Sequence, residues 1–234
     1  MVDLTPFKVE FRMETPICLT YPFIHFDGLI AHLWLRKKDS HFYRSLPSKK
    51  VVNVLEKEDN FPLKKTGDIY HASISFFDIK DAFTTKIYKK FCEKYLDLKR
   101  IRKKKIDKTR GHFKDHMISL VYVPARKVIF YGCGDVSTID DLLKNLAGLG
   151  KKTSIGYGFI NDYKIKEIKD DLSVVKEGIA MRPIPKEMLK EWSELVLMAY
   201  KPPYWAKENV KLCAPPGACV KISSNLLKLN NKNK

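Results

Sequence analysis

Long apolar stretches are missing from this sequence. No segment approaches the roughly 18 uncharged apolar residues that cross a membrane as a helix. The longest candidate, residues 24–35, is interrupted by His25, Asp27 and His32. Residues 1–6 have neither a basic start nor an apolar run, so we expect no secretory signal. A basic amphipathic helix or a lipidation site is not evident either, so we expect no membrane partner.

Cysteines are few. The five are odd in number and mostly scattered, which suits reduced thiols better than a disulfide framework, and we expect a cytoplasmic protein. Cys213 and Cys219 are close in sequence, but their spacing is longer than that of a zinc-binding pair and no second pair lies nearby. We interpret residues 213–219 as a proline-rich turn and expect no metal and no cofactor.

Acidic residues are outnumbered by basic ones. The chain has 44 Lys and Arg against 27 Asp and Glu, a net charge of +17. Such an excess favours a polyanionic partner, and nucleic acid is favoured over an anionic membrane surface because no membrane-binding element is evident. The alternative is that the lysines serve only solubility.

Apolar periodicity predicts an α+β chain. Residues 7–13 alternate like a half-buried strand, and Asp27 is placed to cap a helix over 28–35. A second strand is predicted at 69–77 and a short helix within 83–98.

The next segments continue this pattern. Residues 117–123 and 127–131 predict a hairpin, Asp135 or Ser137 caps a helix over 139–146, and 157–168 alternates as a strand. The order of strand, helix, strands, helix and strand is typical of a ferredoxin-like α+β fold, although other α+β proteins share it. We predict such a domain over residues 1–170.

The C-terminal residues differ in composition. Residues 171–234 contain six prolines, a helix candidate at 186–198 and a polar, lysine-bearing end. We predict that they form an extension docked on the first domain.

A glycine-rich loop at residues 148–158 is the most informative segment. Its glycines permit positive φ angles and close backbone approach to a ligand, while its lysines and hydroxyls suit a phosphodiester. It is not a Walker loop, since Lys152 stands where Ser or Thr is required and a helix precedes it. The alternative is a helix C-cap followed by a solvated turn. The predicted RNA contacts are Gly148, Gly150, Lys151, Lys152, Thr153, Ser154, Gly156 and Tyr157.

A basic arm forms the densest charge in the chain. From Lys99 to Lys114 there are nine basic residues and one acid, Asp107. We expect it to attract phosphates with little base selectivity; a solvated loop is the alternative. Tyr122, Phe130 and Tyr157 are candidates for stacking on bases, although aromatic residues in strands more often belong to the core. The predicted phosphate contacts are Lys99, Arg100, Arg102, Lys103, Lys104, Lys105, Lys108 and Arg110.

Histidines leave an enzymatic alternative open. A metal-independent endoribonuclease needs an acid and a base that titrate near pH 7, and His25 and His71 are the candidates. Histidines on partly apolar elements are more often structural, so we expect no catalysis.

Several motifs resemble a known family. A helix with paired leucines, a Gly-x-Gly-Lys-Lys-x-Ser-x-Gly-Tyr-Gly loop and a strand resemble the signature loop of CRISPR-associated RAMP proteins. Other segments are similar to the type IV RAMP subunit that holds the 5′ end of the guide RNA. They are 19–33, 70–73, 131–135, 182–185, 202–205 and the Cys213-x-x-Pro turn.

The resemblance implies a ferredoxin-like RNA-recognition fold with or without a degenerate second half. It also implies a noncatalytic subunit that binds the 5′ handle of the guide RNA. Its partners would be backbone RAMP subunits and a large subunit, and target nucleic acid would be reached through the guide. The alternatives are an endoribonuclease that processes the precursor, with His25 or His71 at its site, and an RNA-binding protein outside CRISPR.

Overall fold

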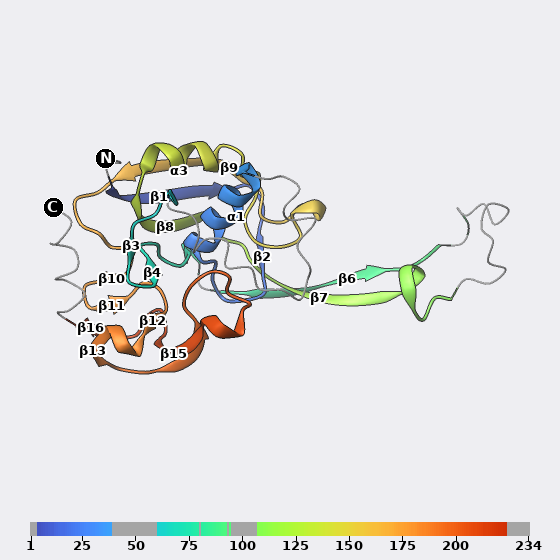
Figure 1. Ribbon diagram of the computed structural model, residues 1–234. Helices are drawn as coiled ribbons and strands as arrows, with labels where there is room; N and C mark the ends of the chain where they lie inside the picture. Colours follow the sequence, from blue (N-terminus) through green and yellow to red (C-terminus); the bar gives the residue numbers. More distant parts are fainter. Residues whose placement is uncertain (1–3, 39–59, 80, 93, 95–106, 224–234) are drawn as a thin grey trace.

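The computed structural model describes residues 4–38, 60–79, 81–92, 94 and 107–223 (Figure 1). A body containing most of the helices and strands gives rise to one long ribbon, formed by two strands that protrude from it. The body holds two apolar cores, one for each of its two groups of sheets. The chain is therefore of the α+β class, as predicted.

A four-stranded antiparallel sheet organises the first core. Its strands are β1 (Thr5–Met13), β5 (Phe76–Phe77), β8 (Lys127–Gly134) and β9 (Ile160–Glu167), in the order β5-β8-β1-β9. Along β1, three fully buried residues, Phe7, Val9 and Phe11, alternate with charged ones. This alternation directs one face of the sheet into the core and the other towards solvent.

Two helices contribute to this core. They are α1 (Phe26–Lys38) and α3 (Val136–Leu143). The Asp135 cap is confirmed, because its carboxylate accepts hydrogen bonds from the N–H and hydroxyl of Thr138, at 3.2 and 2.5 Å. The predicted cap at Asp27 is wrong. The helix begins before this residue, and the Asp27 carboxylate instead accepts from Arg182 and Tyr204.

A second sheet extends into the protruding ribbon. It contains β2 (Ile17–Leu19), β7 (His116–Val123) and β6 (Phe83–Lys89), in the order β2-β7-β6. A helix was expected within 83–98, but residues 83–89 form a strand because they pair with β7 along their whole length. The hairpin expected between 117–123 and 127–131 is also wrong: β7 pairs with β2 and β6, whereas β8 pairs with β1 and β5.

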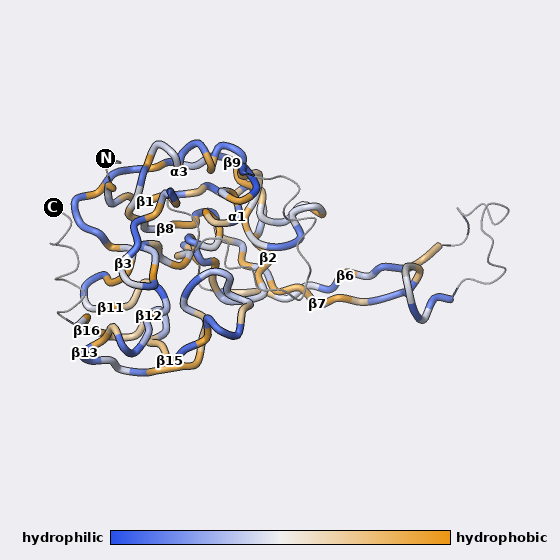
Figure 2. Tube along the Cα trace, in the orientation of Figure 1, coloured by the Kyte–Doolittle hydropathy of each residue, from blue (hydrophilic) through white to orange (hydrophobic). Residues whose placement is uncertain are grey.

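The ribbon is part of a long excursion, residues 78–126, between two neighbouring strands of the first sheet. Asp78 closes its neck: its carboxylate accepts hydrogen bonds from the N–H groups of Arg126 and Lys127, at 3.0 and 3.2 Å. The excursion thus begins and ends beside the paired strands β5 and β8. Figure 2 shows that apolar residues occur along the protruding strands as well as in the body.

The strand predicted at 69–77 is broken into two short pieces. Residues 69–70 form β4 (Ile69–Tyr70), which pairs with β3 (Lys65–Thr66), and residues 76–77 form β5. Between them, the N–H groups of Ser73, Ile74 and Ser75 donate to Tyr131, Met181 and Ile24 respectively. Because these acceptors come from three different segments, the chain cannot continue as one strand.

Small sheets form the C-terminal part around the second core. The helix expected over 186–198 is wrong: a single turn, η6 (Lys186–Met188), leads into two strands that pair with β16 and β15. The strands are β10 (Val175–Lys176), β11 (Ile179–Ala180), β12 (Ile184–Pro185), β13 (Leu189–Trp192), β14 (Val196–Ala199), β15 (Val210–Ala214) and β16 (Val220–Ile222). Further single turns are η4 (Gly111–Phe113), η5 (Thr153–Ile155) and η7 (Lys207–Asn209).

Arg182 joins the C-terminal part to α1 and to the segment that follows β4. Its guanidinium donates to the Asp27 carboxylate at 3.0 Å and to the carbonyl of Ala72 at 3.1 Å, and both charged groups are only 1% exposed. The domain boundary at residue 170 stays a prediction. In the described ranges, no helix is both long and apolar enough to span a membrane.

Candidate nucleic-acid interface

The glycine loop is fixed at both ends by backbone hydrogen bonds. The N–H of Lys151 donates to the Cys18 carbonyl, and the N–H of Gly158 donates to the Pro16 carbonyl, each at 2.8 Å. The N–H of Leu149 donates to the Gly158 carbonyl, also at 2.8 Å. The loop is therefore closed on itself and attached beside β2, an edge strand of the second sheet.

Close contacts within the protein explain two of the glycines. Gly158 has φ +70°, and a Cβ atom there would lie 1.9 Å from the Leu149 carbonyl oxygen. At Gly150, with φ +83°, a Cβ atom would lie 2.6 Å from the Cys18 oxygen. Packing of the loop therefore requires glycine at both positions, and the predicted approach of their backbone to a ligand stays a prediction. Gly156 differs, because a Cβ atom there would meet nothing within 4 Å.

The loop presents several polar side chains to solvent. Lys151, Lys152 and Ser154 are exposed, and Thr153 is partly exposed. Lys152 occupies the left-handed region with φ 64°, which ends the extended segment and starts η5. The carbonyl of Lys152 accepts from Ile155 and Tyr157, so the turn holds its own shape. The loop is thus a rigid support for two cationic side chains.

A row of aromatic rings continues from the loop across the second sheet. The ring of Tyr157 lies 6.2 Å from that of Tyr122 on β7, which stacks at 5.9 Å on Phe83 of β6. Phe83 is 49% exposed, and sequence analysis missed it because its partner strand was assigned to a different hairpin. Phe130, predicted as a candidate for stacking, is instead fully buried between Phe11 and Phe26 and cannot reach a base.

Cationic residues follow the protruding strands. Lys86, Lys89 and Lys90 are exposed on or just after β6. Of the predicted basic arm, Lys108 and Arg110 are exposed, and the Nε of Arg110 donates to Asp107 at 2.8 Å. The remaining members, Lys99, Arg100, Arg102, Lys103, Lys104 and Lys105, lie outside the described residues.

A pocket of about 470 Å³ lies at the root of the ribbon. Its apolar lining includes Leu19, Phe77, Val121 and Val123. Val121 and Tyr122 are successive residues of one strand and so point to opposite faces. The pocket therefore lies on the other face of the sheet from the aromatic row.

His71 lies inside a hydrogen-bonded chain of side chains. Its Nδ1 is 2.5 Å from Asp171 Oδ2, and its Nε2 is 2.6 Å from the Thr66 hydroxyl. Ser173 donates to the other oxygen of Asp171 at 2.5 Å. Burial acts to raise the pKa of Asp171, but the hydrogen bonds from His71 and Ser173 outweigh it and lower that pKa to about 2. Because His71 is only 8% exposed and Thr66 7%, the geometry is that of a buried structural network.

His25 stacks flat on Tyr204, with ring centroids 3.6 Å apart. Burial lowers the pKa of His25 to about 4, although the nearby Asp27 carboxylate opposes the shift. The imidazole is therefore neutral at pH 7 and cannot act there as a general acid. The two histidine candidates contact different partners and are not joined into one site by any contact among the described residues.

Cys213 and Cys219 differ in their exposure to solvent. Cys213 is buried in β15, whereas Cys219 is exposed, and all five cysteines are free thiols. Over the described ranges, no group of three or more His, Cys, Asp or Glu side chains is placed to hold a metal ion.

Comparison with known proteins identifies the family. The family model described as CRISPR type IV associated protein Csf3 matches residues 78–216, which is more than half of the chain and includes the ribbon, the glycine loop and Arg182. No curated protein matches the sequence. The resemblance to type IV RAMP proteins is confirmed, and the chain belongs to the Csf3 family of CRISPR type IV associated, RAMP-type subunits.

Proposed function

We propose that this chain is a noncatalytic guide-RNA-binding subunit of a type IV CRISPR effector complex. It holds the 5′ handle of the guide RNA and helps to assemble the ribonucleoprotein in the cytoplasm. Backbone RAMP subunits and a large subunit are its protein partners, and the guide RNA mediates contact with target nucleic acid. Membership of the Csf3 family supports a role inside such a complex.

The topology of the first sheet supports a ferredoxin-like RAMP fold. In chain order, its elements are β1, α1, β5, β8, α3 and β9, and the sheet order is β5-β8-β1-β9. This is the β-α-β-β-α-β arrangement of ferredoxin-like domains, with both helices contributing to the core on one face. The second and third strands of this unit are separated by the excursion that carries the ribbon.

The observation that carries the proposal is that the exposed lysines of the glycine loop lie next to the row of aromatic rings. Lys151 and Lys152 are exposed, and none of the described acidic side chains forms an ion pair with either. Tyr157 ends the same loop and starts the row that runs through Tyr122 to Phe83. Cations that bind phosphates next to rings that stack on bases are the combination used to bind single-stranded RNA.

The noncatalytic part of the proposal rests on the two histidines. His25 is neutral at pH 7, and both ring nitrogens of His71 are already occupied by Asp171 and Thr66. We expect the protein to leave precursor guide RNA intact, with or without a divalent metal ion. A single cut that disappears in His25→Ala or His71→Ala would establish the endoribonuclease alternative instead.

The test of RNA binding replaces the two loop lysines. Lys151→Ala with Lys152→Ala should weaken guide-RNA binding and retention in the purified complex without unfolding the protein, because both side chains are exposed. The matched control is Lys169→Ala with Lys190→Ala, which removes the same charge from exposed positions outside the loop. Two lost phosphate contacts should reduce the log–log salt slope by about 1.4 for single-stranded RNA. Equal affinity and slope in the two double variants would overturn the site.

A further inference from the structure

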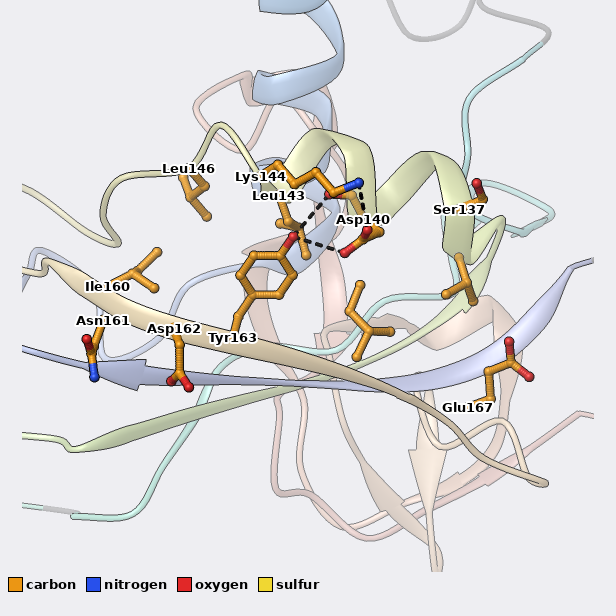
Figure 3. Close-up of a pocket in the computed structure, with 12 residues that line it drawn as sticks. Ser137, Asp140, Leu143, Lys144, Leu146, Ile160, Asn161, Asp162, Tyr163 and Glu167 are labelled. Carbon is orange, nitrogen blue, oxygen red and sulfur yellow. Dashed lines mark hydrogen bonds and ion pairs between the residues drawn. The ribbon is translucent and has the colours of Figure 1, made fainter.

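A groove separates α3 from the edge of the first sheet. It has a volume of about 860 Å³ and lies between α3 and β9 (Figure 3). Its lining includes the apolar side chains of Val136, Leu146, Ile160 and Ile165, all of which are also packed against the first core. The groove therefore has an apolar floor supported by the core.

One hydrogen bond fixes the two walls relative to each other. Figure 3 shows Tyr163 rising from β9 towards Asp140 on α3, and its hydroxyl donates to the carboxylate at 2.9 Å. Burial and this hydrogen bond raise the pKa of Tyr163 to about 12, so the bond persists throughout the physiological pH range. The same Asp140 carboxylate also pairs with Lys144 at 3.1 Å. The groove is thus preformed.

The strand that lines the groove has an open edge. Within the described part of the chain, β9 pairs with β1 on one side, and it is the last strand in the sheet. The N–H of Ile168 donates to the Pro6 carbonyl of the neighbouring strand. Because antiparallel ladder bonds alternate, the N–H and C=O groups of Tyr163, Ile165 and Glu167 point away from β1. Such a row of backbone donors and acceptors is a template for another strand.

The charge of the groove is opposite to that of the whole chain. On the face towards α3, Asp140 and Glu167 line it together with one cation, Lys144, in a protein of net charge +17. Asp162, by contrast, lies on the other face of β9 and pairs with Arg12 at 3.6 Å. The ammonium of Lys144 is itself engaged by Asp140 and Asp141, at 3.1 and 2.9 Å. An acidic lining repels the RNA backbone and attracts cationic side chains.

We propose that this groove binds an extended segment of a protein partner, which adds to β9 as a fifth strand and directs Lys or Arg side chains towards α3. Strand addition between a sheet edge and a helix obtains affinity from backbone hydrogen bonds and specificity from alternate side chains. Lys164 and Lys166 lie on the opposite face of β9 from Tyr163 and Ile165. The partner segment therefore alternates, with basic or apolar residues facing α3 and acidic or polar residues on the other face. This surface is distinct from the proposed RNA site and does not depend on it.

Two synthetic peptides test the proposal with the full-length chain in the absence of RNA. The patterned peptide, fluorescein-labelled Lys-Glu-Val-Thr-Lys-Glu-Val-Thr, places both lysines on one face of a strand and both glutamates on the other. The control, Lys-Lys-Val-Thr-Glu-Glu-Val-Thr, has the same composition but carries one charge of each sign on each face. Fluorescence anisotropy should show about tenfold tighter binding of the patterned peptide.

Charge variants then locate the binding. Glu167→Lys should weaken binding of the patterned peptide by about fivefold, the effect of a rim ion pair turned into a repulsion. Glu208→Lys, the same change at an exposed position in η7 outside the groove, should leave the affinity unchanged. Equal affinity for the two peptides, or no difference between the two variants, would overturn the proposal. The proposal would also be overturned if neither peptide bound and the Glu167→Lys variant bound a uridine decamer more tightly than the wild type does. Since no outcome with the peptides involves guide RNA, failure here is distinguishable from failure of the RNA-binding proposal.

Discussion

The body and the protruding ribbon of this protein differ in how far their side chains are buried and in what holds them in place. In the body, Arg182 is 1% exposed and donates hydrogen bonds to Asp27 and to the carbonyls of Tyr70, Ala72 and Tyr200. On the ribbon, Tyr88 is 69% exposed and Met117 52%, and the strands are held mainly by their own ladder. Changes at buried residues of the body should therefore alter stability, whereas changes at exposed residues of the ribbon should alter binding alone.

The largest expected effect is that of breaking the Arg182 network. Arg182→Met leaves the buried Asp27 carboxylate without its cation, and we expect a loss of about 3–5 kcal/mol in the free energy of unfolding. Urea denaturation measures it. Adding Asp27→Asn to Arg182→Met should recover part of the loss, because the orphaned charge is then removed. A loss below about 1 kcal/mol would mean that the ion pair does not hold the C-terminal part to α1.

A smaller effect in the body depends on pH. The pKa of His25 falls from 6.5 in the unfolded chain to about 4 in the folded one, so between these values the unfolded state binds more protons. The contribution of neutral His25 to the free energy of unfolding is fully present above pH 6.5. This contribution falls by up to about 3 kcal/mol as the pH drops through 4.

The variant that isolates this effect is His25→Phe, which can still stack on Tyr204. Urea denaturation at pH 7 and pH 4.5 should show a larger loss of stability in the wild type than in the variant, where His32, whose pKa is also lowered by burial, still contributes a loss. Asp171 does not interfere in this window, because its pKa is lowered from 3.8 to about 2 and its contribution is lost only as the pH falls below about 4. An equal pH dependence in both proteins would contradict the depressed pKa of His25.

The smallest effect on stability is expected on the ribbon. Lys86→Gln with Lys89→Gln changes two exposed residues of β6, so the free energy of unfolding should stay within about 0.5 kcal/mol. The log–log slope of RNA affinity against salt should nevertheless fall by up to about 1.4, or about 0.7 per lost phosphate contact. Affinity titrations across a salt series measure the slope. A loss of stability comparable to that of Arg182→Met would remove the distinction between the two regions.

Local patterns were sufficient to predict several elements. Strand β1 follows from its alternation over residues 7–13, and α3 follows from Asp135, which caps the helix through a residue only three positions away. The glycine loop was also recognisable, because its residue types are contiguous. Its two lysines are exposed, as a solvent-facing loop requires.

Contacts between distant residues could not be predicted from sequence. Arg182 and Asp27 are 155 positions apart, and His71 and Asp171 are 100 apart, so no local spacing connects them. The strands at 116–123 and 127–134 are separated by a short turn, which is typical of a hairpin. They nevertheless belong to different sheets, because each pairs over most of its length with a more distant partner. Strand 116–123 pairs with β6, and strand 127–134 pairs with β1. The same competition turned the expected C-terminal helix into strands of the second core.

The neck at Asp78 has a consequence for how the reach of this protein can vary. Residues 78–126 leave and rejoin the sheet at adjacent strands, so the sheet is indifferent to how many residues lie between them. Closing a loop of twice the length costs only about 0.6 kcal/mol more. Insertions or deletions between β6 and β7, away from the residues of β7 that pair with β2, should thus be nearly neutral for folding. The reach of the ribbon along the proposed guide RNA can therefore change while the domain that carries it stays the same.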